Sequence, residues 1–204
     1  MIGLIDYKLS NINSVANVLK LLEKKFRVIE KYQDISDISM IILPGVGSFK
    51  QAMKNIKSQD LDKLIKLANE KKIIIFGICL GMQLFYENSE EDGGSDGLGL
   101  IKGSVKFIKK NTKEFRVPNV GWRKLNILKK NMIFDNIEDQ SAFYFVHKYE
   151  CHTENRDNLI GNIDYSKKID SVINFDNIYG TQFHPEKSQK VGIKLIHNLT
   201  RNLL

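Results

Sequence analysis

The stretch IIIFGICLG, residues 73–81, places an apolar run directly before a turn with the pattern G-x-C-x-G. A short apolar run is typical of a buried strand, and Met82, Leu84 and Phe85 favour a helix after the turn. Glycines beside Cys79 suit a tight strand-to-helix turn, where backbone comes too close for a β-carbon. The segment predicts an α/β fold with a nucleophilic cysteine, because a helix N-terminus favours the thiolate.

Apolar strands alternate with amphipathic helices through the first hundred residues. Strands are predicted at residues 2–5, 26–29, 40–43 and 73–76. Helices are predicted along 15–22, capped by Asn13 or Ser14, and along 61–68, capped by Asp60. This alternation predicts an α/β protein with a mostly parallel, doubly wound sheet and helices on both faces.

The pattern changes beyond Ser104 to short strands separated by turns. These strands are predicted at residues 105–108, 125–128, 142–146, 159–163, 171–175 and 178–183, and a helix at 191–199 closes the chain. We expect the later strands to add an antiparallel part to the sheet. The acidic, glycine-rich segment 90–99 is interpreted as a mobile surface loop. A length of 204 residues suits one domain, residues 1–204.

Composition and charge exclude several classes of function. The net charge is +7, but the lysines are spread in pairs along the chain, so we expect no nucleic-acid partner. The apolar run 73–80 is far shorter than the roughly 20 residues of a membrane helix, and Asp6 interrupts the N-terminal apolar run, so neither a membrane span nor a leader is expected. Two cysteines make no disulfide framework, which favours a cytoplasmic protein.

A nucleophilic cysteine needs a base, and the base needs a group that orients it. The sequence His184-Pro185-Glu186 offers both, directly after the predicted strand 178–183. Alone this motif would be a weak signal, because a surface histidine is the commoner explanation. Together with the turn at Cys79 it predicts a triad of Cys79, His184 and Glu186 at the strand ends, where α/β folds gather their sites.

Acyl-transfer chemistry also needs donors for an oxyanion. The segment Pro44-Gly45-Val46-Gly47 follows a predicted strand, and the backbone of Gly45, Val46 and Gly47 could aim N–H groups at the same edge. The amide of Leu80 would be the second donor. His147 could lie at this edge too. No Cys and His spacing matches a zinc site, so we expect no metal.

Six segments together make the chain resemble the class I, or triad, glutamine amidotransferases, in particular the glutaminase subunits of imidazole glycerol phosphate synthases. The resemblance covers nearly the whole chain, and the order and spacing of the motifs are specific. The matching segments are residues 44–49 (PGVGSF), 77–83 (GICLGMQ), 97–100 (GLGL), 118–122 (PNVGW), 144–147 (YFVH) and 182–187 (QFHPEK).

The resemblance implies a reaction and a partner. Cys79 would attack the side-chain amide of glutamine, His184 would move the proton, and Glu186 would orient His184. Positions that hold glutamine match Gln83, Glu91 and Tyr149. Ammonia would pass to a (β/α)₈ cyclase in a heterodimer of histidine biosynthesis, with no cofactor. Partner-facing positions match Asn11, Trp122, Tyr144 and Lys187, although core packing explains Trp122 equally well.

Four positions depart from the family's usual pattern. Ser10 replaces a glycine, Asn119 a histidine and Arg123 an asparagine, all on the side expected to face the partner. Lys148 stands where a small hydroxyl residue is commoner. These departures leave open a paralogous glutaminase that feeds a related barrel in amidino-sugar biosynthesis. A non-catalytic binding protein and a cysteine peptidase or isomerase of similar architecture are further alternatives.

Overall fold

The structure, a computed structural model, describes the chain except residues 10, 33–34, 110–114, 202 and 204. One half of its main sheet consists of strands that run parallel to their neighbours, as the alternating pattern predicted. Their order is β2 (Phe26–Ile29), β1 (Ile2–Ile5), β3 (Met40–Gly45), β4 (Ile74–Cys79) and β14 (Ile178–Thr181).

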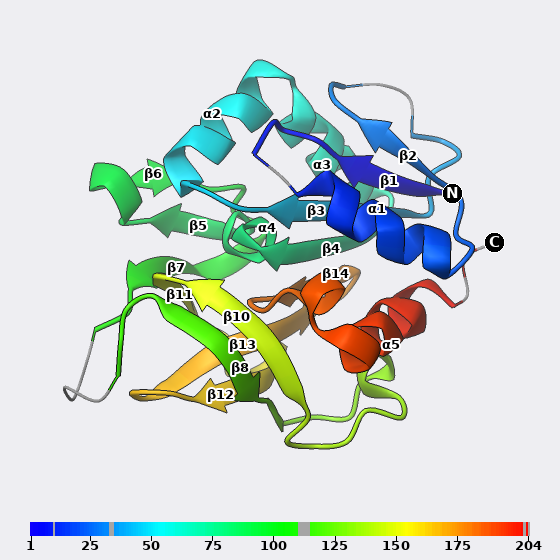
Figure 1. Ribbon diagram of the computed structural model, residues 1–204. Coiled ribbons are helices and arrows are strands. Elements are labelled where there is room, and N and C mark those ends of the chain that lie inside the picture. Colours follow the sequence, from blue (N-terminus) through cyan, green and yellow to red (C-terminus); the bar gives the residue numbers. More distant parts are fainter. Residues whose placement is uncertain (10, 33–34, 110–114, 202, 204) are drawn as a thin grey trace.

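The other half of the sheet is mainly antiparallel, which confirms the predicted change of pattern. It continues from β14 through β13 (Lys168–Phe175), β11 (Tyr149–Thr153), β7 (Ile101–Phe107), β5 (Tyr86–Ser89) and β6 (Ser95–Asp96). From β13 the sheet branches to β12 (Leu159–Asp164) and β9 (Asn126–Ile127). A separate antiparallel ribbon pairs β8 (Asn119–Lys124) with β10 (Ala142–His147) (Figure 1).

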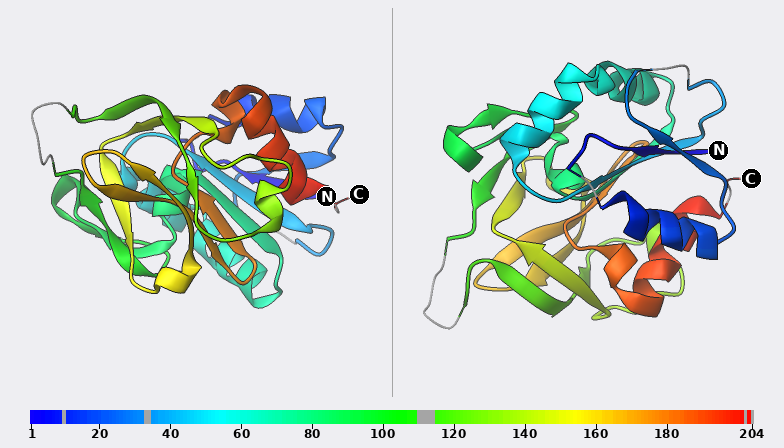
Figure 2. Two further views of the ribbon diagram at one scale, coloured as in Figure 1. Left: turned by 90° about the horizontal axis from the view of Figure 1, so that it is seen from below. Right: turned by 45° about the horizontal axis from the view of Figure 1, so that its top comes forward.

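Helices cover both faces of the parallel half (Figures 1 and 2). One face carries α2 (Phe49–Ser58) and α3 (Leu61–Glu70), and the opposite face carries α1 (Ile12–Leu21) and α5 (Gln189–Thr200). A single turn, α4 (Leu80–Gln83), follows β4 directly. Short 3₁₀ turns are η1 (Glu91–Gly93), η2 (Met132–Phe134), η3 (Arg156–Asn158) and η4 (Pro185–Lys187). Within the described residues, each helix is too short or too polar to cross a membrane.

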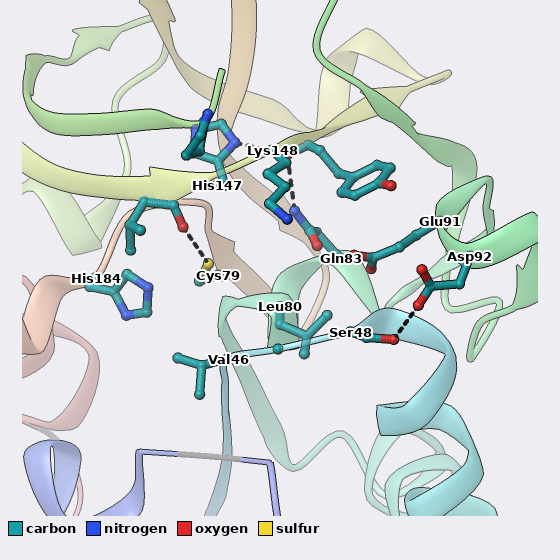
Figure 3. A pocket seen from close by; sticks show the side chains of 14 residues that line it. Val46, Ser48, Cys79, Leu80, Gln83, Glu91, Asp92, His147, Lys148 and His184 are labelled. Carbon is teal, nitrogen blue, oxygen red and sulfur yellow. Dashed lines mark hydrogen bonds between the residues drawn. The ribbon is translucent and has the colours of Figure 1, made fainter. Parts of the chain in front are cut away.

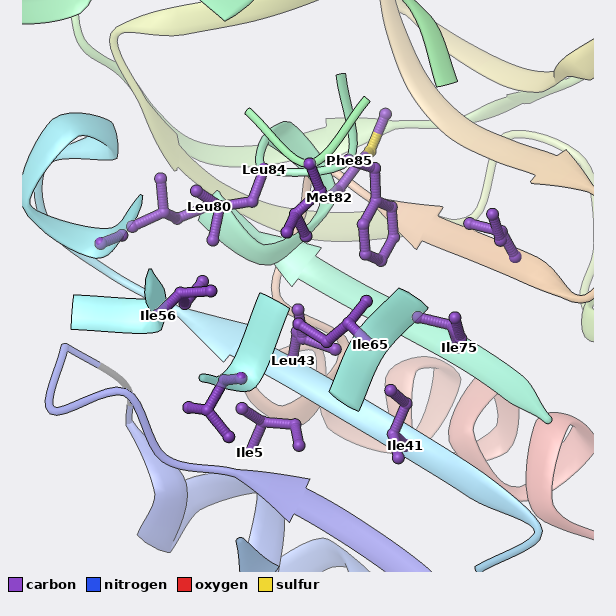
Figure 4. Close-up of a cluster of buried hydrophobic side chains, with 14 of the residues drawn as sticks. Ile5, Ile41, Leu43, Ile56, Ile65, Ile75, Leu80, Met82, Leu84 and Phe85 are labelled. Carbon is purple, nitrogen blue, oxygen red and sulfur yellow. The ribbon is translucent and has the colours of Figure 1, made fainter. Parts of the chain in front are cut away.

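The core lies on both faces of the sheet because strand side chains alternate between them. On β3, Ile41 and Leu43 pack into the cluster under α2 and α3, whereas Met40 and Ile42 join the cluster under α1 and α5. Figure 4 shows the first cluster, in which Leu43 meets side chains of the helices that cover this face. Continuous apolar strands are thus explained by burial on two sides.

Several helix boundaries differ from the sequence predictions. The first helix begins at Ile12, so Asn13 and Ser14 lie inside it and do not cap it. Asp60 has a left-handed backbone conformation and makes no capping hydrogen bond, because its carboxylate pairs with Lys63 at 2.7 Å. Helix α2 was not predicted; it begins after Ser48, whose side chain accepts a hydrogen bond from the Gln51 N–H.

The antiparallel half also differs from the predictions in detail. Strands β8 and β11 were not predicted, and the strand expected at 125–128 is reduced to β9. The strand expected at 178–183 ends at Thr181, two residues before Phe183. Segment 90–99, predicted as a loop, contains the short elements η1 and β6. The bounds of these strands depend on pairing with strands that are distant in the sequence. A short sequence window carries no information about that pairing.

The turn between β4 and α4 is tightly packed. Cys79 has φ 54° and ψ −107°, an unfavourable backbone conformation that costs about 1–3 kcal/mol. A β-carbon on Gly81 would overlap the carbonyl oxygen of Leu43, and one on Gly77 would lie 2.6 Å from the Gly81 carbonyl carbon. These approaches press α4 against β3, so the strained residue stays at the end of β4.

We predict that Gly81→Ala lowers the free energy of unfolding by at least about 3 kcal/mol, because the backbone of β3 must move away from the new methyl group. Gly99→Ala is the control: a β-carbon on Gly99 would meet nothing within 4 Å, although Gly99, unlike Gly81, has a positive φ, of 64°. That change should cost only about 1 kcal/mol. Chemical denaturation measures both, and equal losses would show that the approach to Leu43 is unimportant.

Candidate active site

A cavity of about 500 Å³ opens at the carboxyl ends of β3 and β4. Register pairs Gly45 with Cys79 and Thr181 with Ile78, so the segments that follow β3, β4 and β14 meet at one edge. Figure 3 shows the side chains around this cavity. Its lining includes Val46, Gly47, Ser48, Cys79, Leu80, Gln83, Glu91, Asp92, Pro118, Val146, His147, Lys148, Tyr149 and His184.

Cys79 lies at the base of the cavity and is 6% exposed. Its Sγ lies 4.0 Å from the carbonyl oxygen of Val146 and 3.6 Å from the side-chain nitrogen of Gln182. Cys79 therefore lies between the cavity and the core cluster under α1 and α5, to which it also belongs. The turn predicted from G-x-C-x-G is therefore present, at the strand end where it was expected.

His184 lies beside Cys79 (Figure 3). Its Nδ1 is 2.7 Å from Oε1 of Glu186, and both side chains are almost fully buried. Nε2 of His184 is buried and has no hydrogen-bond partner in the described part of the chain. Burial alone would lower the pKa of His184, but the neighbouring Cys79 and Glu186 outweigh it and raise this pKa to about 10. The ring is thus an imidazolium at neutral pH.

Ser188 holds the segment that carries His184. Its hydroxyl donates to the His184 carbonyl at 2.6 Å and accepts from the Tyr144 N–H at 3.0 Å. The His184 N–H in turn donates to the Tyr144 carbonyl at 2.9 Å. This role of Ser188 was not predicted, although a serine just before a helix is a recognisable signal. These bonds fix the histidine to β10 of the ribbon.

The predicted oxyanion segment is in place, but one donor points elsewhere. The Val46 N–H donates to the Leu9 carbonyl at 3.0 Å, so it does not face the cavity in this structure. Gly47 has φ 99°, and a β-carbon on Gly45 would overlap the buried hydroxyl of Tyr7. Leu80 follows Cys79 as the first residue of α4. For Val46, the expectation of a donor aimed into the site is wrong for this conformation.

The three residues expected to hold a substrate lie in the same cavity. Gln83 donates from Nε2 to the Tyr149 carbonyl at 3.1 Å and to the side chain of Gln182 at 3.0 Å. Glu91 accepts from the Phe49 N–H at 2.7 Å. Burial raises the pKa of Glu91, and the Phe49 N–H and Lys148 oppose that rise. Tyr149 packs edge-on against Phe107, with ring centroids 5.6 Å apart.

His147 and Lys148 also line the cavity, although the sequence favoured neither strongly. Nδ1 of His147 is 2.8 Å from the Tyr149 carbonyl, and Nε2 is 3.0 Å from Nδ2 of Asn119. Burial lowers the pKa of His147 to about 4, so the ring is neutral. Because the carbonyl can only accept, Nδ1 carries the hydrogen and Nε2 accepts from Asn119. Lys148 extends beside Gln83 (Figure 3).

The four positions expected to face a partner are all at least partly accessible. Trp122 is 43% exposed, so core packing does not explain it. It lies opposite Tyr144 across the ribbon, with ring centroids 6.0 Å apart. Asn11 precedes α1 and makes no capping bond, and Lys187 is exposed beside Glu186. Among the described residues no group of His, Cys, Asp and Glu could hold a metal ion.

Comparison with known proteins identifies the family. The family model "Glutamine amidotransferase class-I" matches residues 3–202. The chain is 40% identical to imidazole glycerol phosphate synthase subunit HisH of Methanocaldococcus jannaschii, covering 100% of both chains. It is 42% identical to the protein of the same name from Oceanobacillus iheyensis, covering 96% of both.

Solved structures share the fold at low sequence identity. A structure titled PurLQS from Thermotoga maritima has a TM-score of 0.76 at 18% identity, covering 100% of this chain and 98% of that one. A structure titled glutamine amidotransferase has a TM-score of 0.73 at 14% identity, covering 98% and 97%. The chain therefore belongs to the class-I glutamine amidotransferases, in the family of imidazole glycerol phosphate synthase HisH subunits.

Proposed function

We propose that this protein is the glutaminase subunit of an imidazole glycerol phosphate synthase, with Cys79, His184 and Glu186 as its catalytic triad. It hydrolyses glutamine and supplies the ammonia to a (β/α)₈ cyclase in histidine biosynthesis. The observation that carries this proposal is the strained Cys79 beside the His184–Glu186 pair, at the base of a cavity. The full-length similarity to HisH subunits supports the choice of pathway.

The geometry suits acyl transfer through a thioester. The Cys79 thiolate attacks the carbonyl carbon of the glutamine side chain, and the carbonyl electrons move to the oxygen. His184 donates its Nε2 proton to the departing nitrogen, which leaves as ammonia as the tetrahedral intermediate collapses. Neutral His184 then accepts a proton from the water that attacks the thioester. Glutamate leaves and the thiolate is restored, while Glu186 keeps Nδ1 protonated.

The charges in the cavity match the two ends of an amino-acid zwitterion. Glu91 offers a carboxylate for the α-ammonium group, held in place by the Phe49 N–H. Lys148 adds an ammonium group on the wall beside Gln83, which suits the α-carboxylate. Paired charges of opposite sign fix the direction in which glutamine enters. Its side-chain amide then points to Cys79.

The bond between Val46 and Leu9 suggests how a partner controls activity. While the Val46 N–H donates to Leu9, it cannot stabilise an oxyanion beside Cys79. Leu9 lies two residues before Asn11, in the segment expected to face the partner. Docking there shifts the population towards a conformation in which the Val46 peptide turns into the cavity. We therefore expect low glutaminase activity alone and a strong increase with the ligand-bound cyclase.

The exposed face of the ribbon suits the docking of that cyclase. Across β8 and β10, Val120 lies opposite Val146 and Trp122 opposite Tyr144, so all four side chains share one face. Val120, Trp122 and Val146 are exposed, and Val146 also lines the cavity. A partner on this face would close the cavity rim against water. Ammonia would then pass between the subunits without escaping.

The paralogous glutaminase of amidino-sugar biosynthesis would share the catalytic residues. The relatives named above carry the imidazole glycerol phosphate synthase name, which favours the histidine pathway. Complementation of a histidine auxotroph lacking this subunit, with the cognate cyclase supplied, tests the choice. Growth without histidine supports the proposal. Failure to grow, with both proteins present and folded, contradicts it.

We predict that Cys79→Ala lowers glutamine-dependent turnover of the complex at least about a thousandfold, because the thioester cannot form. Turnover of the same complex with added ammonia should be unchanged, since only the glutaminase reaction needs the thiol. Glutamate release and cyclase product formation measure the two. Normal glutamate release from Cys79→Ala would show that another residue is the nucleophile. Absence of glutamate release from the unaltered complex would instead favour a binding protein or a peptidase.

We predict that His184 is an imidazolium and His147 a neutral imidazole at pH 7.5, as their pKa values of about 10 and about 4 require. Because the folded-state pKa of His184 is raised, the stability that its protonation contributes is fully present below pH 6.5 and is lost as pH rises through about 10. Nitrogen chemical shifts of ¹⁵N-labelled histidine measure both states. In Cys79→Ala the pKa of His184 should fall, and a neutral His184 in the unaltered protein would contradict the ion pair.

We predict that Trp122→Ala weakens binding of the cyclase about thirtyfold, a loss of about 2 kcal/mol, without unfolding the chain. Phe175→Ala is the control, because Phe175 is a similarly exposed aromatic residue on β13, outside the ribbon. Partner titration and thermal melting are measured for both variants. Unchanged affinity together with a lowered melting temperature for Trp122→Ala would exclude an anchoring role.

A further inference from the structure

Gln182 is a fully buried residue that lies between Cys79, the proposed nucleophile, and Gln83 in the cavity wall. It directly follows β14 and precedes His184 by two residues. Its Nε2 donates to Sγ of Cys79 at 3.6 Å, and its Oε1 accepts from Nε2 of Gln83 at 3.0 Å. Gln182 does not itself line the cavity, so its amide reaches the sulfur from the protein interior.

The orientation of this amide is determined by its neighbours. The Tyr149 carbonyl can only accept a hydrogen bond, so the atom of Gln83 that faces it at 3.1 Å must be the nitrogen. The same nitrogen faces Gln182, so the Gln182 atom that meets it must be the oxygen. The Gln182 N–H group is therefore left to face Cys79. A reversed amide would bring its oxygen to the thiolate and its nitrogen to another donor.

Cys151 strengthens this arrangement. Its Sγ lies 3.9 Å from Oε1 of Gln182 and donates to it. Burial, with Asp170 nearby, raises the pKa of Cys151 well above its usual value, so the thiol keeps its hydrogen. Oε1 thus accepts from two donors, Gln83 and Cys151. Two donors on one end of a buried amide fix the direction of the other end.

A hydrogen bond from a neutral amide N–H acts on the Cys79 sulfur differently from the imidazolium of His184. It stabilises negative charge on Sγ but has no proton to give, so it cannot return the nucleophile to the thiol form. The Val146 carbonyl, a further polar neighbour of Sγ beside His184 and Gln182, can only accept and gives a thiolate no stabilisation. Because hydrogen bonds to charged groups are stronger than neutral ones, a single N–H here matters.

We propose that Gln182 is a positioning residue of the nucleophile: its amide N–H holds Sγ of Cys79 as a thiolate, with Gln83 and Cys151 keeping the amide in place. The proposal rests on Cys79 being the nucleophile of the proposed function. It gives a role to Cys151, which the triad does not use. It also connects a cavity residue, Gln83, to the sulfur through one shared amide.

The test replaces Gln182 by methionine, which keeps the length of the side chain and removes the N–H group. The rate of Cys79 alkylation by iodoacetamide is followed against pH, with the modified cysteine identified by mass spectrometry. The midpoint of this profile should move up by about one pH unit, the size expected for one hydrogen bond to a charged group. In the complex with the cyclase, kcat for glutamine should fall at least about tenfold with little change in KM.

Thr181→Val is the matched control. Thr181 is also fully buried, and its hydroxyl donates to the Phe183 carbonyl at 3.1 Å without touching Cys79. This variant should lose stability and keep the midpoint of alkylation. An unchanged midpoint in folded Gln182→Met, or an equal shift in Thr181→Val, would overturn the proposal. A separate result would show that Cys79 is not the nucleophile at all. In that case, full alkylation of Cys79 in the unaltered protein would leave glutaminase activity intact.

A second measurement covers the case in which Gln182→Met does not fold. In the unaltered protein the side-chain amide resonances of Gln182 should shift over the same pH range in which alkylation of Cys79 accelerates. In Cys79→Ala they should stay constant over that range. Amide resonances that do not respond to pH in the unaltered protein would overturn the proposal.

Discussion

The contact on which the site depends is the approach of Gly81 to the Leu43 carbonyl, where α4 presses against the end of β3. It leaves the chain no room to relax the conformation of Cys79. A second glycine also allows close backbone packing, because a β-carbon on Gly192 of α5 would overlap the Pro185 carbonyl. Close packing at two glycines thus holds α4 against β3, next to Cys79, and α5 against the turn that carries His184.

Within that frame the two buried histidines of the site carry different charges. His184 has a carboxylate and a cysteine as neighbours, and its pKa rises to about 10 despite burial. His147 lies between a carbonyl and an amide, and burial lowers its pKa to about 4. The positive charge of His184 adds to that lowering. A second imidazolium beside the first would compete for the thiolate, so a neutral His147 leaves the pair of Cys79 and His184 undisturbed.

The sequence predicted features that depend on local patterns: the parallel strands, the turn at Cys79 and the His184–Glu186 motif. It also contained a signal for α2, since Phe49, Ala52, Met53 and Ile56 recur at helical spacing after Ser48. Contacts between distant segments were not predictable from one sequence. The bond from Val46 to Leu9 and the contact of Gln182 with Cys79 span 37 and 103 residues, respectively, and no local pattern encodes either.

Asn119 and Arg123, two positions where the sequence resemblance is incomplete, belong to one hydrogen-bonded set. Neutral His147 needs a donor at Nε2, and the Asn119 amide nitrogen supplies it at 3.0 Å. The Asn119 oxygen then needs a donor of its own, which Arg123 supplies from Nε at 2.9 Å. A chain of bonds thus runs from the ribbon that would face the cyclase to the wall of the cavity. Asn119 and Arg123 therefore act as one hydrogen-bonded unit that ends at His147. This unit therefore connects the ribbon to the cavity, because His147 lies in the cavity wall.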